Sequence, residues 1–197
     1  VGNVGLVIVM PCNFQDDLAL SKGPCQNRDA EILMAMIPRA ISVSQSSLAA
    51  DKNGVDYIVT LTRGGVLYVD AKTRRPGASK YWQESPDGQL VPDIALEKWS
   101  VKPSHGKKGK VGWTLCTQKK TDLVLYTFDP SDTPSAFLFS FQLLRMAFHK
   151  NLKEWFITYK HAPQDNVSWE SEAVFVPVPV VQAAVVMVAE YSPTTTS

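Results

Sequence analysis

Cysteine and histidine are scarce in this chain of 197 residues, and their spacing gives them no shared chemical role. They lie far apart along the sequence, at Cys12, Cys25, Cys116, His105, His149 and His161. The cysteines are odd in number and form no CxxC pair, which argues against a disulfide framework and against a zinc cluster. The histidines support neither zinc-ligand spacing nor a Ser-His-Asp triad. This cysteine usage favours a reducing, cytoplasm-like compartment.

A large excess of one charge is also missing, as are long hydrophobic runs. Lysine and arginine total 20 and aspartate and glutamate total 19, so any surface for a polyanion must be local. Residues 4–10 are apolar but too few to span a bilayer, and we expect no membrane association. We expect an N-terminal extension over residues 1–27, a single domain over residues 28–190 and a flexible tail over residues 191–197.

Hydrophobic periodicity predicts both helices and strands along the chain. Helices are predicted over residues 28–38 and 137–153, where apolar residues recur at helical spacing. Strands are predicted over residues 40–45, 55–61, 66–72, 94–101, 111–115 and 123–128. Residues 174–180 contain Pro177 and Pro179, which suits an edge strand or an extended segment.

The most informative part of the sequence is a predicted hairpin over residues 55–72. Asp70 and Lys72 are separated by one residue on a predicted strand, so their side chains share a face. Asp56 lies on the partner strand and joins that face only if the turn contains an odd number of residues, with a glycine bulge at Gly64 or Gly65. A turn of even length would place Asp56 on the opposite face.

Asp56 and Asp70 are the residues from which a cation site would be built. Two carboxylates supply hard oxygen ligands that suit Mg²⁺, and this ion keeps positions for water and for a phosphate oxygen. Lys72 would steady the attacking water or the charge that develops on phosphorus. We expect Glu31, in preference to Asp29, to reach over from the first helix as a fourth member of the site.

These residues resemble a known superfamily. An acidic residue in a leading helix, then Gly54-Val55-Asp56-Tyr57-Ile58-Val59, a glycine turn and Val69-Asp70-Ala71-Lys72 are similar to the motif of the PD-(D/E)XK nucleases. The resemblance covers residues 28–75, and the later half of the chain resembles uncharacterised phage and prophage members. Val55 stands where the usual proline lies, and Asp70 replaces the commoner glutamate.

The resemblance implies a fold, an activity and a location. The fold would be α/β of the restriction-endonuclease type, with a mixed sheet between the two predicted helices. Asp56 and Asp70 would bind Mg²⁺, with Mn²⁺ as a substitute, and Lys72 would assist the water that hydrolyses DNA. The protein would act in the cytoplasm of a bacterial or phage-infected cell, and a homodimer, in which two sites cut two strands, stays open.

Basic residues near the predicted site would contact the phosphate backbone of DNA. They are Arg74, Arg75 and Lys80, followed by Tyr81 and Trp82, and the loop lysines Lys107 and Lys108. Ordinary solvated loops would explain the same residues.

Each candidate site residue has an alternative structural explanation. Asp70 and Lys72 would form a solvated charge pair, Asp56 would begin a strand, and Glu31 would stabilise a helix N-terminus. Glu97, on an otherwise apolar predicted strand, would face either solvent or the site. Two other classes of protein therefore stay open: a catalytically inactive nuclease-fold module that binds DNA, and a structural or interaction protein of a virion.

Overall fold

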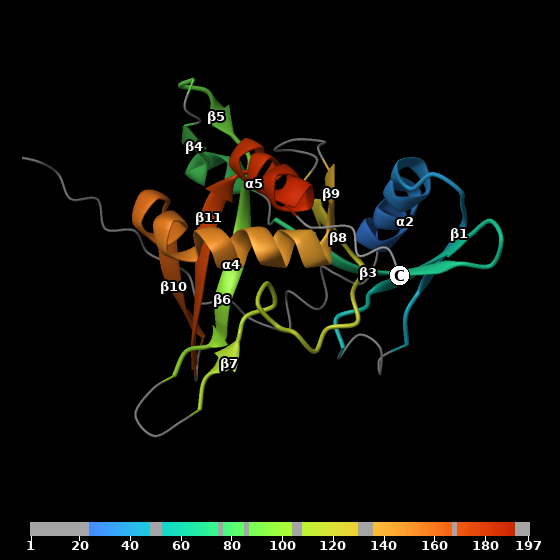
Figure 1. The fold of residues 1–197 in the computed structure, drawn as a ribbon, viewed down its shortest axis with the longest axis horizontal. Coiled ribbons are helices and arrows are strands. Elements are labelled where there is room, and N and C mark those ends of the chain that lie inside the picture. Colours follow the sequence, from blue (N-terminus) through green and yellow to red (C-terminus); the bar gives the residue numbers. More distant parts are fainter. Residues whose placement is uncertain are drawn as a thin grey trace, which may run out of the picture.

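The computed structural model describes residues 24–47, 53–74, 77–84, 87–103, 108–129, 136–166 and 169–191. The chain is a mixed α/β protein, as predicted, with its strands arranged in more than one sheet (Figure 1). Most of the predicted N-terminal extension, the predicted tail beyond residue 191, and the basic residues Arg75 and Lys107 lie outside the described residues.

The central sheet has five strands in the order β1-β2-β3-β8-β9. They are β1 (Ala40–Gln45), β2 (Tyr57–Leu61), β3 (Val66–Thr73), β8 (Leu123–Thr127) and β9 (Ala136–Ser140). Strands β3 and β8 run parallel, whereas the other neighbours are antiparallel. The sheet is therefore mixed, and the predicted hairpin supplies its second and third strands.

A second sheet of four strands has the order β10-β11-β6-β7 and was not predicted as a separate layer. Its strands are β10 (His161–Asn166), β11 (Trp169–Pro177), β6 (Asp93–Val101) and β7 (Lys110–Val111). A short 3-10 helix η1 (Ala78–Tyr81) and the small pair β4 (Gln83–Glu84) and β5 (Leu90–Val91) precede β6. The connection between the parallel strands β3 and β8 thus contains β6 and β7 of the second sheet.

Three helices complete the described fold: α2 (Pro24–Met36), α4 (Phe141–Thr158) and α5 (Val178–Tyr191). Side chains alternate along β3, so Val69 faces α2 and packs near Leu33, whereas Asp70 faces the opposite side. Helices α4 and α5 and the second sheet lie on that opposite side (Figure 1). Within the described residues, no helix combines the length and the hydropathy needed to cross a membrane.

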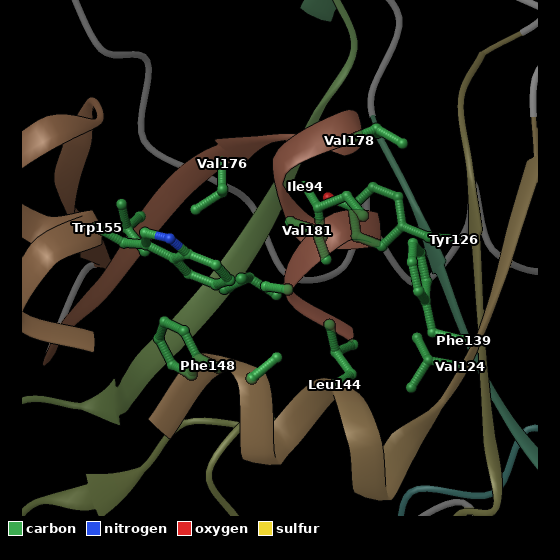
Figure 2. Packing of buried hydrophobic residues seen from close by; sticks show 14 of the residues in the cluster. Ile94, Val124, Tyr126, Phe139, Leu144, Phe148, Trp155, Val176, Val178 and Val181 are labelled. Atoms are coloured by element: carbon green, nitrogen blue, oxygen red, sulfur yellow. The ribbon is translucent and has the colours of Figure 1, made fainter. Parts of the chain in front are cut away.

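The larger hydrophobic core joins the two sheets to α4 and α5. Figure 2 shows Val124 and Tyr126 of the central sheet facing Ile94 of the second sheet and Leu144 of α4. The Tyr126 hydroxyl accepts a hydrogen bond from the Ala95 backbone N–H at 2.9 Å, which joins β8 to β6. The face of the central sheet that carries Asp70 is therefore largely covered, and the site lies at the margin of this core.

Three predicted elements differ from the structure. Residues 137–140, expected to open a helix, form most of β9, and α4 begins only after Ser140, whose hydroxyl accepts from the Leu143 backbone N–H. The predicted strand over residues 111–115 is limited to β7, because the chain turns after Gly112. Residues 174–180 are not an edge segment: β11 lies between β10 and β6, and Pro177 ends it.

Candidate active site

The turn between β2 and β3 decides whether the acidic residues meet. Tyr57 pairs with Val69 and Thr60 pairs with Val66, so an odd number of residues separates the last paired positions. Gly64 adopts a left-handed backbone conformation with φ 83°, which glycine tolerates without strain. This register places Asp56 on the face that carries Asp70, as the odd-turn prediction required.

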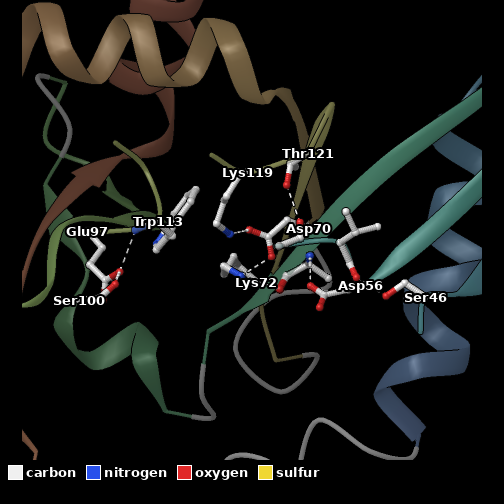
Figure 3. Close-up of polar contacts among 12 residues, drawn as sticks. Ser46, Asp56, Asp70, Lys72, Glu97, Ser100, Trp113, Lys119 and Thr121 are labelled. Atoms are coloured by element: carbon white, nitrogen blue, oxygen red, sulfur yellow. Dashed lines mark hydrogen bonds and ion pairs between the residues drawn. The ribbon is translucent and has the colours of Figure 1, made fainter. Parts of the chain in front are cut away.

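Asp70 is buried and is held by two ammonium groups. Its side chain is 2% exposed, whereas the side chains of Lys72 and Lys119 are 31% and 15% exposed. Lys72 donates to Oδ1 and Lys119 donates to Oδ2 (Figure 3). Burial alone would raise the pKa of Asp70, but the two lysines outweigh it and hold that pKa below its ordinary value. Asp70 is therefore ionised at neutral pH.

Asp56 lies beside this ion pair. Its Oδ2 accepts a hydrogen bond from the Ala71 backbone N–H at 2.7 Å, which fixes the carboxyl next to β3. Burial raises the pKa of Asp56 to about 7, and the nearby Asp70 carboxylate adds to this effect while Lys72 opposes it. The carboxylates in turn raise the pKa of Lys72, although burial acts against its charge.

The pKa of Asp56 predicts how the stability of the metal-free protein depends on pH. Between about pH 4 and pH 7 the folded protein keeps a proton on Asp56 that the unfolded chain releases, so the free energy of unfolding falls as the pH rises. Asp56→Asn lacks this titration. We expect its stability relative to the unsubstituted protein to increase by about 1–3 kcal/mol from pH 4.5 to pH 8, measured by urea denaturation with a chelator present.

The quantity to follow is the difference in the free energy of unfolding between the two proteins at each pH. The other buried acids are present in both proteins, so their titration largely cancels in this difference. Stability curves that stay parallel across this pH range would show that Asp56 has an ordinary pKa. They would also show that burial and the neighbouring Asp70 carboxylate do not disfavour the charged form of Asp56.

Lys119 was not singled out by sequence reasoning, and its position depends on contacts between distant segments. The Lys120 backbone N–H donates to the Asn53 carbonyl at 3.2 Å, and the Thr121 hydroxyl donates to the Gly54 carbonyl. A Cβ atom at Gly54 would lie 2.7 Å from Lys119 Nζ, so this glycine provides the space that the ammonium occupies. The segment that contains Lys119 is therefore hydrogen-bonded to the turn that precedes Asp56.

Trp113 borders both lysines. Its ring centroid is 5.7 Å from Lys72 Nζ and 5.9 Å from Lys119 Nζ, which is within the range of a cation-π contact. Glu97 fixes the segment that carries this ring, because its Oε2 accepts from the Trp113 backbone N–H at 2.9 Å and from the Ser100 hydroxyl at 2.7 Å. Glu97 lies near the site but is occupied in holding the Trp113 turn (Figure 3).

Gly112 allows this turn to pack against β6. A Cβ atom there would lie 2.2 Å from the Glu97 carbonyl oxygen, a backbone atom that cannot rotate away. We therefore expect Gly112→Ala to lower the free energy of unfolding by about 3 kcal/mol in urea denaturation. At Gly65 the nearest atom to an added Cβ is 3.6 Å away, so Gly65→Ala is a matched control with an expected effect within about 0.5 kcal/mol. Equal effects of the two substitutions would contradict the close approach at Gly112.

The expectation for Glu31 is not supported. Glu31 is exposed on α2, and α2 packs on the face of the central sheet opposite to Asp70. Asp29 is the buried acid of this helix, and Tyr57 donates a hydrogen bond to its Oδ2 at 3.4 Å. The helical spacing was correct, but the face assigned to the core was wrong, because Asp29 and Leu33, four residues apart, face the sheet together.

The basic residues proposed to bind phosphate are distributed differently from the prediction. Arg74 forms an ion pair with buried Asp93 at 2.7 Å and stacks over the Phe175 ring at 4.8 Å, so its guanidinium connects the end of β3 to the second sheet. Lys108 is exposed, as predicted for a surface contact. The backbone of Lys80 belongs to η1, and its side chain lies outside the described part of the structure.

Asp56 and Asp70 are the two acidic groups of the site that could hold a divalent cation. Two carboxyl groups lie close together, and the raised pKa of Asp56 reflects burial without sufficient positive charge. Groups of three or more acidic, histidine or cysteine side chains able to hold a metal do not occur in the described part of the chain. A cation held by Asp56 and Asp70 alone would take its other ligands from water or from a bound molecule, which Mg²⁺ tolerates.

Comparison with protein-family models, with curated proteins and with solved structures finds no match for this chain. The structure itself defines the class of protein. It is a mixed α/β protein whose central mixed sheet carries a cluster of two acids and two lysines. The nuclease superfamily and the restriction-endonuclease type of fold stay predictions from the motif.

Proposed function

We propose that this protein is a divalent-metal-dependent nuclease that hydrolyses phosphodiester bonds in DNA. The observation that carries the proposal is the convergence of Asp56, Asp70 and Lys72 on one face of the β2-β3 hairpin. The sequence motif predicted all three residues. The observed register of β2 and β3 places their side chains on the same face.

The proposed roles follow from the position of each group. Asp56 and Asp70 would hold Mg²⁺ or Mn²⁺, which would supply Lewis acidity and favour deprotonation of the attacking water. Lys72, partly exposed beside both acids, orients the attacking water and balances the charge that develops on phosphorus. The water oxygen forms a bond to phosphorus, one P–O ester bond breaks, and the products are a phosphate monoester and an alcohol.

The charges of the site favour an anionic substrate. With both acids ionised, Lys72 and Lys119 make the cluster neutral, and a bound divalent cation makes it doubly positive. A phosphodiester group then approaches a locally positive patch, although the whole chain is nearly neutral. The choice of DNA as the substrate rests on the resemblance to the PD-(D/E)XK motif.

A cleavage screen tests this proposal. Linear, supercoiled and four-way-junction DNA are incubated with the protein and Mg²⁺ or Mn²⁺, with chelator as the blank. We expect metal-dependent cleavage that is lost in Asp56→Asn and kept in Glu31→Gln, because Glu31 is exposed and lies away from the site. Cleavage by Asp56→Asn at the rate of the unsubstituted protein would contradict the proposed ligand set.

A second candidate is a DNA-binding module that cleaves nothing. It is favoured by the pairing of both Asp70 carboxyl oxygens with lysines, an arrangement that is complete without a metal ion. Binding of DNA without cleavage under either metal would select it. If the protein binds neither DNA nor metal in calorimetry, a structural or interaction role is selected instead.

A further inference from the structure

Lys119 is the residue of the site that the nuclease motif leaves without a role. Two lysines pair with the same carboxylate, one on each oxygen, and Figure 3 shows both side chains pointing at Asp70. Lys72 also acts on Asp56, because the electrostatic attraction of Asp56 contributes to its pKa. Lys119 acts on the other oxygen of Asp70.

The two lysines lie closer to solvent than Asp70 does. The lysine side chains are 31% and 15% exposed and the Asp70 side chain is 2% exposed, so an incoming anion meets the ammonium groups before it meets Asp70. A cation bound by Asp70 would compete for the oxygen that Lys119 now holds. The ammonium would then be free to pair with an anionic ligand of that cation.

The surroundings of Lys119 keep its ammonium in place when that pairing changes. The Trp113 ring lies on one side, and the backbone at Gly54 leaves space for the side chain. The hydrogen bond from Thr121 to the Gly54 carbonyl fixes the backbone two residues further on. A lysine that is held at its base and contacts an aromatic ring loses little conformational freedom when it binds a ligand.

We propose that Lys119 binds a non-bridging phosphate oxygen of the DNA strand that is cut, and that together with Lys72 it forms a two-lysine phosphate clamp. This inference rests on the proposed nuclease function and adds a substrate-binding residue to it. The simpler explanation, that Lys119 serves only to neutralise buried Asp70, predicts different behaviour once the charge on Asp70 is removed.

A double-mutant cycle separates these explanations without any need for cleavage. Binding of a labelled DNA strand is measured by fluorescence anisotropy, with chelator present, for the unsubstituted protein, Lys119→Met, Asp70→Asn and the double variant. Asp70→Asn is expected to bind about tenfold more tightly, because a negative charge beside the phosphate is removed. Adding Lys119→Met is expected to cancel this gain and to reduce the salt dependence of binding by about one counterion.

Lys120→Met is the matched control, because Lys120 is adjacent and exposed but its side chain does not contact Asp70. In Mg²⁺, Lys119→Met is expected to lower kcat by about 30-fold or more, whereas Lys120→Met leaves kcat unchanged. If Lys119→Met leaves DNA affinity unchanged in the Asp70→Asn background, the clamp is wrong and Lys119 is a counterion only. That result is independent of the nuclease proposal, which fails instead if Asp70→Asn still cleaves DNA.

Discussion

Replacing Asp70 with alanine is expected to reduce Mg²⁺-dependent DNA cleavage by about 10³-fold or more. Asp70 is the only carboxylate of the described site that is both buried and held ionised by two lysines, so its loss removes the proposed metal ligand and the counterion of Lys72. The measurement is the single-turnover cleavage rate, with circular dichroism to confirm that the variant is folded. The two lysines are partly exposed, so water can solvate their ammonium groups when Asp70 is removed, which preserves the fold.

Asp70→Asn is the companion variant, because it keeps the shape of the side chain and removes only the charge. It is expected to lose activity to the same extent as Asp70→Ala. A folded variant of either kind that cleaves DNA within tenfold of the normal rate would show that Asp70 takes no part in the reaction.

Replacing Lys72 with methionine is expected to reduce the cleavage rate by about 10²–10³-fold while leaving the affinity for the divalent cation nearly unchanged. Methionine keeps the length and apolar character of the lysine side chain but has no ammonium to orient water or to balance charge on phosphorus. Lys72→Arg is expected to be impaired as well, because a planar guanidinium differs in shape and donor geometry from the compact ammonium that pairs with Asp70 beside Trp113.

Metal affinity is the readout that distinguishes this role from a structural one. If Lys72 only supported the position of Asp70, its substitution would weaken cation binding and cleavage together. Retained metal binding with a reduced rate supports the proposed role, whereas a cleavage rate that is unchanged in Lys72→Met contradicts it.

The hairpin was predictable because its information is local. The alternation of apolar residues, the glycine-containing turn and the spacing of Asp70 and Lys72 all fall within residues 55–72. Side chains on neighbouring strands share a face only in one register parity, so the turn length alone determined whether Asp56 would join Asp70. The structure confirms that parity.

Lys119 was missed because its position depends on parallel pairing between β3 and β8, which are about 50 residues apart. The sequence pattern of residues 117–122 does not predict that a lysine there contacts Asp70. The second sheet was missed for a related reason, since β10 has a mixed and polar sequence and is a strand only because it pairs with β11. Helix α5 was hidden by Pro177 and Pro179, which are tolerated because one ends a strand and the other lies in the first turn of a helix.

The error at Glu31 has a different origin. Residues 28–38 contain apolar residues on more than one side of the helix, so several faces were compatible with burial. Tertiary packing selected the face with Asp29 and Leu33, where a hydrogen bond from Tyr57 satisfies the buried acid. Helical periodicity can identify such a helix without determining which of two neighbouring acids points inward.

Calorimetric titration with Mn²⁺ at pH 8 tests most directly whether Asp56 and Asp70 together form a cation site. Mn²⁺ stands in for Mg²⁺ and gives a measurable heat, and at pH 8 the Asp56 carboxyl, with its pKa of about 7, is ionised. The account predicts saturable binding by the unsubstituted protein and by Glu31→Gln, with binding lost in Asp56→Asn and in Asp70→Asn. Equal binding by all four proteins, or binding by none, would contradict it.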